Sequence, residues 1–186
     1  MRTRRRVLAA TALSISGVVG CLDDGLDELP GMGGREETEQ QDQRHEILLG
    51  YEDALEQRND GIETRDGGID LFNAEEYADA VDEIETARDR FAAAADGFET
   101  AADAAAEIDT EDPAVEDARE ICLDAAENTR LQLAATEAGL AAATAAADGE
   151  DAGTINDHVV AYQELVAEAE AFPVADGEEL ADVLGF

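Results

Sequence analysis

The chain has 186 residues, of which 47 are Asp or Glu and 12 are Lys or Arg, so its formal net charge is −35 at pH 7. A surface of this sign argues strongly against nucleic acid as a partner, because contacts to phosphate need a basic surface. All 12 basic residues are arginine, and four of them precede Val7; the chain from residue 21 onward therefore keeps 47 acidic and eight basic residues, a charge of −39.

The balance between charge and apolar residues makes folding depend on the solvent. Leu, Ile, Val and Phe make up only 33 of the residues from 21 to 186, a fraction near the composition boundary for disorder. A compact state needs the charge to be screened, and the Debye length falls to about 3 Å in 1 M salt. The acidic residues are spread along the whole chain. This distribution favours a hydrated, salt-adapted surface over a binding block for one basic partner.

The first 20 residues have the pattern of an export signal. Arginines at positions 2, 4, 5 and 6 precede an apolar run over 7–19. This run is shorter than the roughly 20 residues that a membrane-spanning helix needs. A basic start followed by a short apolar run is typical of a signal peptide, so residues 1–20 are predicted to be one.

Two finer motifs lie in this segment. Arg4-Arg5 followed by Val7-Leu8 resembles the twin-arginine motif that exports folded proteins in prokaryotes. Residues 18–21, Val-Val-Gly-Cys, resemble a lipobox. That resemblance implies a lipid on the Cys21 thiol and an anchor at the outer face of the cytoplasmic membrane. An uncleaved anchor and cleavage elsewhere stay open as alternatives, and all three place the body outside the cytoplasm. Together with the acidic, lysine-free composition, the leader resembles that of lipoproteins of salt-loving archaea.

The body is predicted to follow a tether. Residues 21–35 are rich in Asp, Gly and Pro, which favours a flexible acidic tether. A first helix is predicted over 36–71, where apolar residues recur at steps of four and seven. Its glycines predict a break near 59–61 or 67–68.

The second helix is predicted over 74–108, with Asn73 as N-cap and Glu76 completing a capping box. Its seam alternates steps of four and three, the period of helices packed along their length. The seam residues are Tyr77, Val81, Ile84, Arg88, Phe91, Ala95, Phe98, Ala102 and Ala105.

Asp112-Pro113 predicts the start of a third helix, which extends to about Ala147. Its expected inner face is Val115, Ala118, Cys122, Ala126, Thr129, Leu133, Thr136, Leu140 and Ala143. Thr154 is predicted to cap a fourth helix that Pro173 ends, and Asp176 to cap a short last helix. No alternating stretch predicts a strand. The predicted fold is an all-α domain over 36–186, an antiparallel bundle of three long helices, a shorter fourth and a short C-terminal helix.

One stretch of the body resembles a known repeat. The spacing of Tyr77, Ala80, Ile84 and Ala87 is similar to the second helix of a tetratricopeptide repeat, and Gly68 and Leu71 loosely match the first. The resemblance covers about 25 residues, has no second copy, and lacks a helix breaker between Ala87 and Ala95. It implies packing of a helical pair and a role in protein binding.

No residue pattern predicts catalysis or a resident cofactor. Cys122 is expected to pack as a small apolar residue, and His45 and His158 to face solvent. Neither histidine belongs to a paired metal motif, and the acidic loops fail the EF-hand spacing. Three hypotheses remain: a tethered module that binds protein or supports the envelope, a lipid-anchored binding component of a transporter, and an enzyme without a recognisable motif.

Overall fold

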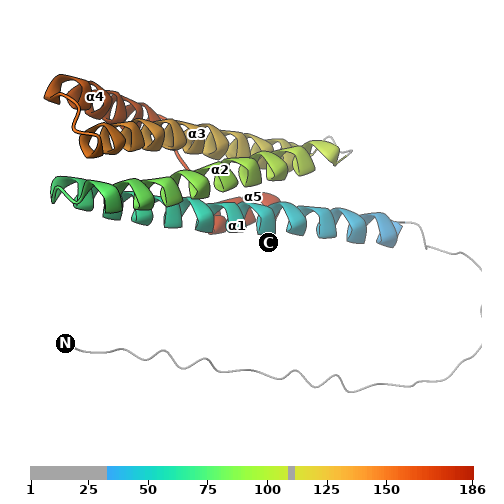
Figure 1. The fold of residues 1–186 in the computed structure, drawn as a ribbon. Helices are drawn as coiled ribbons and strands as arrows, with labels where there is room; N and C mark the ends of the chain where they lie inside the picture. The colour runs from blue at the N-terminus through green and yellow to red at the C-terminus, as the bar shows by residue number, and fades with distance from the viewer. Residues whose placement is uncertain (1–32, 109–111) are drawn as a thin grey trace, which may run out of the picture. The chain divides into compact units, whose positions relative to one another are not determined.

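The computed structural model describes residues 33–108 and 112–186, with side chains from residue 38 onward. These residues form five helices and no strand, which confirms the all-α prediction (Figure 1). The helices are α1 (Gly33–Asn73), α2 (Tyr77–Glu107), α3 (Pro113–Ala147), α4 (Ala152–Ala169) and α5 (Gly177–Leu184).

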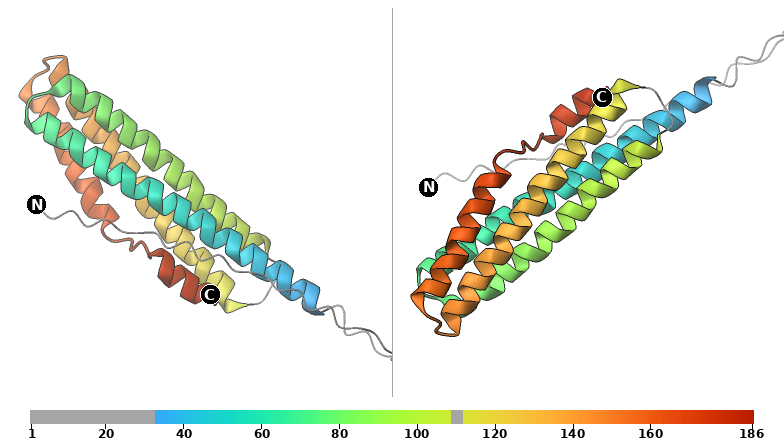
Figure 2. Two further views of the ribbon diagram at one scale, coloured as in Figure 1. Left: turned by 90° about the horizontal axis from the view of Figure 1, so that it is seen from below. Right: turned by 90° about the horizontal axis from the view of Figure 1, so that it is seen from above.

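Each long helix packs against the next one in the chain. α1 lies along α2, α2 along α3, and α3 along α4, while α5 lies against α1 and α3 (Figures 1 and 2). α2 is therefore covered on two sides. At a rise of 1.5 Å per residue, the 41 residues of α1 extend over roughly 60 Å. α1 begins at Gly33, so the last three residues of the expected tether belong to a helix.

The predicted cap between the first two helices is wrong. Asn73 is the last residue of α1, and Glu76 precedes α2 without any side-chain cap bond. The turn is closed by backbone bonds instead: the amides of Ala74 and Glu76 donate to the carbonyls of Asp70 and Leu71, each at 3.0 Å. The last carbonyls of α1 thus bind the turn amides, and no capping side chain is needed.

The other caps are partly as predicted. Asp112 caps α3 and accepts a bond from the Ala114 amide, and Asp176 caps α5 and accepts from the Glu179 amide. The prediction that Thr154 caps α4 is wrong. Asp151 caps that helix, and Thr154 instead donates its hydroxyl to the Asp151 carboxylate at 3.0 Å.

α1 runs without a break, which corrects the predicted interruption near its glycines. Two of these glycines are contact points for α2. A Cβ on Gly61 would lie 3.3 Å from the ring of Phe91, and one on Gly68 would lie 2.5 Å from Cγ1 of Ile84. Small residues allow two helices to approach closely, and this contact outweighs the lower helix propensity of glycine.

This geometry predicts opposite effects for two neighbouring substitutions. Gly→Ala inside a helix ordinarily stabilises by roughly 0.5–1 kcal/mol. Gly67→Ala should follow that rule, since its new Cβ would lie 3.8 Å from the nearest Glu83 oxygen. Gly68→Ala should destabilise by on the order of 1 kcal/mol, because overpacking forces α2 away. Thermal unfolding of both variants in molar salt would measure this, and equal stabilisation would refute the contact.

The buried face of α2 is wider than its predicted seam. Ile84, Phe91, Ala95, Phe98, Ala102 and Ala105 are buried as expected. Ala80, Ala87, Ala94 and Ala101 are buried as well, while Tyr77, Val81 and Arg88 are only partly covered. The physical reason is that α2 contacts α1 on one side and α3 on the other, so two stripes are buried instead of one.

The apolar core forms two clusters. The larger includes Ile47, Tyr51, Phe98, Cys122 and Leu180. The smaller is built on Ala80, Ile84 and Ala143, with partly buried residues of α1 and α3 packed against them. Six polar side chains are buried at positions of α1 and α3 between these clusters: Thr64, Arg65, Asn128, Thr129, Gln132 and Thr136. Of these, Arg65, Asn128 and Gln132 belong to the candidate site described below.

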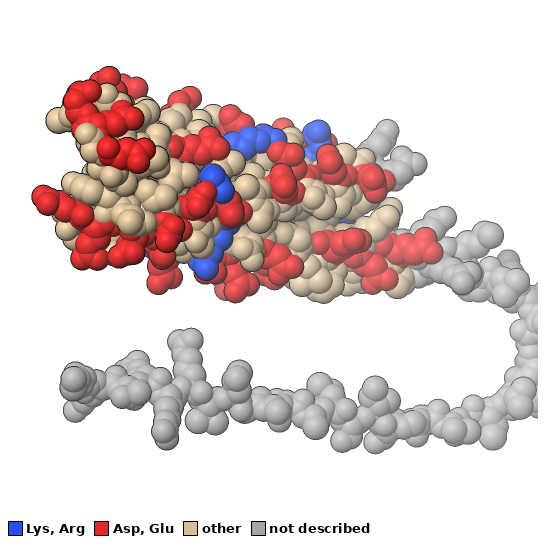
Figure 3. Space-filling view, in the orientation of Figure 1, with Lys and Arg blue, Asp and Glu red and all other residues tan. Residues whose placement is uncertain are grey.

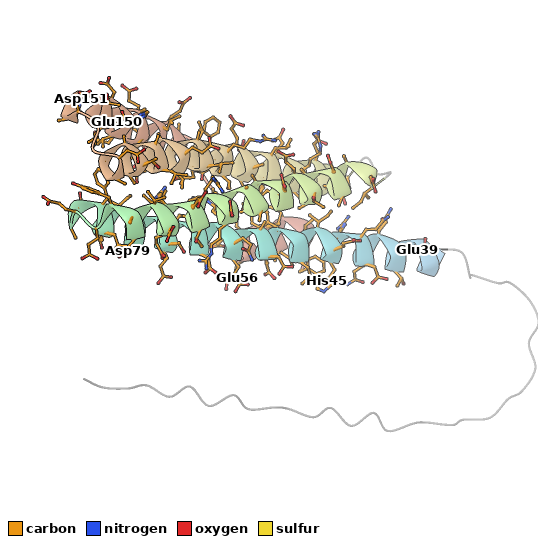
Figure 4. All side chains as sticks on the ribbon, in the orientation of Figure 1. Glu39, His45, Glu56, Asp79, Glu150 and Asp151 are labelled. Atoms are coloured by element: carbon orange, nitrogen blue, oxygen red, sulfur yellow. The ribbon has the colours of Figure 1, made fainter. Side chains whose placement is uncertain are left out.

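The surface is acidic on the face shown in Figure 3, where arginines lie between many more carboxylates. Figure 4 labels examples that are all exposed, on α1, at the start of α2 and at the α3–α4 turn. They are Glu39, Glu56, Asp79, Glu150 and Asp151. Among the helices of the described ranges, none is long and apolar enough to cross a membrane.

Candidate functional site

The arginines of the described helices differ in their partners. Arg44 of α1 forms an ion pair with Asp112, the cap of α3. Arginines on the outer faces of α2 and α3 form ion pairs with carboxylates, as Arg88 does with Glu85 and Asp89. Arg58 and Arg65, seven residues apart on α1, are turned toward α3 and hydrogen-bond to amide side chains there. In the described part of the chain, Arg58 has no ion pair. Arg65 has only its exposed neighbour Asp66, at 3.3 Å.

Arg58 is held by Asn128 of α3. Its Nε and Nη2 donate to the Asn128 Oδ1 at 3.2 and 2.9 Å, and its Nη1 donates to the Asn59 Oδ1 at 3.4 Å. Burial lowers the pKa of Arg58; nearby Tyr51 partly offsets this, and the positive charge of Arg65 lowers the pKa further. The two arginines therefore repel each other across one heptad of α1.

Arg65 lies in the interior, with only 7% of its surface exposed. Its Nη1 donates to the Oε1 of Gln132, and its guanidinium lies 5.6 Å from the Phe91 ring and 5.8 Å from the Tyr162 ring. Its Nε is buried without a hydrogen-bond partner. Residues from four helices thus surround one positive charge. Cation–π contacts, one amide oxygen and the exposed carboxylate of Asp66 stabilise this charge. A buried charge usually has a partner that is buried with it.

Asn128 also fixes the segment after α4. Its Nδ2 donates to the carbonyl oxygens of Ala169 and Phe172 at 2.8 and 2.9 Å, which satisfies the end of that helix. Farther along, the hydroxyl of Tyr51 donates to the Ala175 carbonyl at 2.8 Å, and burial raises the pKa of this phenol. The segment between α4 and α5 is therefore held against α1 and α3.

A cleft of about 400 Å³ opens beside these residues. We call it the arginine cleft; its lining residues are Leu55, Arg58, Asn59, Asn128, Gln132, Glu170, Phe172, Val174, Ala175 and Asp176. It combines guanidinium and amide donors, an apolar wall and two carboxylates. Such a surface can bind a small polar molecule.

The two histidines singled out from the sequence, His45 and His158, do not line the arginine cleft. Arg4, Arg5, Val7, Leu8 and Cys21 are outside the described residues. His45 is exposed and its ring packs edge-on against Phe186, with centroids 5.8 Å apart. His158 is half-buried, so it is less open to solvent than predicted. Within the described ranges, no group of three His, Cys, Asp or Glu could hold a metal ion.

Cys122 packs as a small core residue, as predicted, and is fully buried in the larger cluster. Burial raises the pKa of its thiol to about 12. Because the thiolate is the reactive form, we expect Cys122 to be inert to Ellman's reagent in the folded protein at pH 8. A Cys21→Ser chain, whose only thiol is Cys122, should react slowly in molar KCl and fully after unfolding. Rapid labelling of the folded chain would contradict the packing.

The sequence carried a signal for the arginine cleft that helical periodicity could have revealed. Positions 44, 51, 58, 65 and 72 follow a strict heptad on α1 and hold Arg, Tyr, Arg, Arg and Phe. Arginines at inner heptad positions predict partners inside a bundle. Asn128 and Gln132 gave no comparable signal, because polar residues on a helix are usually exposed.

Comparisons with protein-family models, curated proteins and solved structures find no match for this chain.

Proposed function

We propose that this protein is a lipid-anchored module on the outer face of the cytoplasmic membrane, which binds another protein or supports the envelope at high salt. Export would use the leader residues Arg4, Arg5, Val7 and Leu8. Cys21 would carry the lipid and form the membrane contact. Residues 22–32 would then separate the lipid from the first turn of α1.

In this proposal the body is an antiparallel bundle of α1, α2 and α3, with the shorter α4 and α5 completing it. The packing of each helix on its neighbour supports this arrangement. So do the short connections: residues 74–76 join α1 to α2, and 148–151 join α3 to α4. Short connections favour antiparallel neighbours in helix bundles.

The observation that best supports the proposal is that the acidic side chains of the described body lie outside its core. In the described ranges no Asp or Glu is buried, and Arg65 is the one buried charged residue. The surface therefore presents carboxylates to the solvent and to any partner. Such a surface favours a hydrated module that works in salt, and a partner must bring basic groups or cations to meet it.

The anchor can be tested by mass spectrometry. Wild-type protein extracted from membranes should begin at Cys21 and carry added lipid mass, because the lipobox chemistry needs the thiol. Cys21→Ser should release the body or leave the precursor uncut. Cys122→Ala is the matched control and should keep the anchor. An unmodified Cys21 in the membrane-extracted chain would refute the proposal.

The role in binding can be tested by chemical cross-linking in molar KCl. Wild-type cells should yield a defined cross-linked partner that is absent from cells making Cys21→Ser. Recovery of a membrane permease as that partner would favour a transporter component instead of an envelope module. Cross-links to the chain's own copies alone would argue against a partner protein.

A further inference from the structure

Within the described part of the body, Arg58 has no ion-pair partner, and Arg65 has only the exposed carboxylate of Asp66. A buried or half-buried guanidinium is expensive to hold without a carboxylate or comparable partner. The chain has 47 acidic residues, yet Arg58 is bonded to neutral amides only. Arg65 is bonded to the neutral amide of Gln132 and to a single carboxylate, that of its exposed neighbour Asp66. The two arginines also repel each other. An anionic group in the arginine cleft would give Arg58 the direct partner that it lacks in the described structure.

Arg58 has donors available for such a group. Its three hydrogen bonds use Nε and one hydrogen on each Nη atom, so each Nη keeps one N–H in the described structure. Guanidinium N–H groups bind a carboxylate through charge-assisted bonds of high strength. Gln132, which binds Arg65, lines the same cleft. The positive charge of Arg65 therefore acts on this space as well.

The rest of the cleft selects against a simple anion. Glu170 and Asp176 line it and are exposed, and neither forms an ion pair with Arg58 in the described residues. These two carboxylates would repel a plain anion but attract a cationic nitrogen. Leu55, Phe172 and Val174 supply an apolar wall. A ligand with no net charge also avoids repulsion by the acidic surface.

We propose that the arginine cleft binds a small organic zwitterion, an aliphatic α-amino acid in its chemistry. Its carboxylate bonds to Arg58 in the field of Arg65, and its ammonium group faces Glu170 and Asp176. Its side chain contacts the apolar wall. The volume of about 400 Å³ lies at the small end of ligand sites, which run from about 300 to 1,000 Å³. The proposal goes beyond the tethered-module function and does not depend on the anchor.

The test is isothermal titration calorimetry of the full chain in molar KCl, with L-leucine as probe. Acetate and n-butylamine serve as the two half-ligands. Leucine should bind, and each half-ligand should bind at least roughly ten-fold more weakly, because each makes only one of the charged contacts. Failure of leucine to bind would overturn the proposal. Acetate binding as tightly as leucine would show a simple anion site and would overturn it too.

Two pairs of variants locate the site. Arg58→Gln should weaken leucine binding roughly 10- to 100-fold, since a charged hydrogen bond is lost. Arg88→Gln removes a partly covered arginine that is paired within its own helix and lies outside the cleft, so it should leave binding unchanged. Unchanged affinity in Arg58→Gln would refute the site.

If Arg58→Gln does not fold, as judged by circular dichroism, a pair at the end of α4 decides. Glu170→Gln should weaken leucine binding without weakening that of acetate, whereas Glu168→Gln, outside the cleft, should change neither. Equal affinity for leucine in both variants would overturn the placement of the ammonium group.

Discussion

In dilute buffer the body should expand and lose its cooperative thermal transition, and in molar KCl or NaCl it should be compact and helical. Residues 21–186 carry a formal charge of −39, and about one residue in five is strongly apolar, so little burial opposes the repulsion. The core also buries little apolar surface for each residue, because most of the buried residues on α2 are alanine. At about 0.1 M salt charges act across roughly 10 Å, the distance between packed helices.

Small-angle scattering combined with circular dichroism, from dilute buffer to molar salt, would measure this transition. Some helical signal should survive at low salt, because the helices are rich in alanine and several are capped. A chain that is equally compact at every salt concentration would show that burial outweighs the repulsion.

Lowering the pH should stabilise the folded body at low salt and destabilise it in molar salt. At low salt, lowering the pH toward the sequence pI of about 4.1 should restore compactness, because protonated carboxylates no longer repel. In molar salt the repulsion is screened, so the response of stability to pH should come mainly from the carboxylates that cap the helices. The pKa of Asp112 is lowered mainly by the Ala114 amide, and that of Asp151 mainly by the Thr154 hydroxyl. A lowered folded-state pKa gives stability that is present above the unfolded pKa and lost as the pH falls through the folded one. Thermal melts at both salt concentrations would separate the two effects.

Phe91→Ala should destabilise the body by roughly 3–5 kcal/mol, the usual cost of truncating a fully buried aromatic residue. Phe91 is completely buried on α2, faces Gly61 of α1 closely, and supports the guanidinium of Arg65. Its loss would open a cavity between α1 and α2 and remove a cation–π contact. Urea unfolding in molar KCl would give the free energy.

Asp96→Ala is the matched control on the same helix. Asp96 is exposed, and the hydrogen bond at this position is accepted by its backbone carbonyl, so its side chain can be removed without breaking it. We expect a change of about 0.5 kcal/mol or less apart from the effect of charge. Equal losses for the two variants would show that the buried face of α2 is assigned incorrectly.

The sequence by itself determined the all-helical fold class, two of the helix starts and the acidic character of the surface. Asp112-Pro113 and Asp176 mark helix starts because an acidic side chain and a proline satisfy a helix N-terminus locally, without neighbours. The regular spacing of Phe91 and Phe98 predicts that both face the core, because residues seven apart lie on the same face of a helix. The acidic surface follows from counting charges, which needs no coordinates, and the prediction that folding depends on salt rests on the same count.

Only the tertiary structure decided how the helices meet and where the arginine cleft lies. The glycines of α1 predict a break if the helix is considered alone, but Gly68 lies against Ile84, where a side chain would keep α2 away. Likewise, Asn128 and Gln132 are ordinary polar residues in the sequence. They become partners of Arg58 and Arg65 because α3 brings them beside α1. Local propensity concerns one helix, whereas close approach and buried polar pairing depend on what a second helix places opposite.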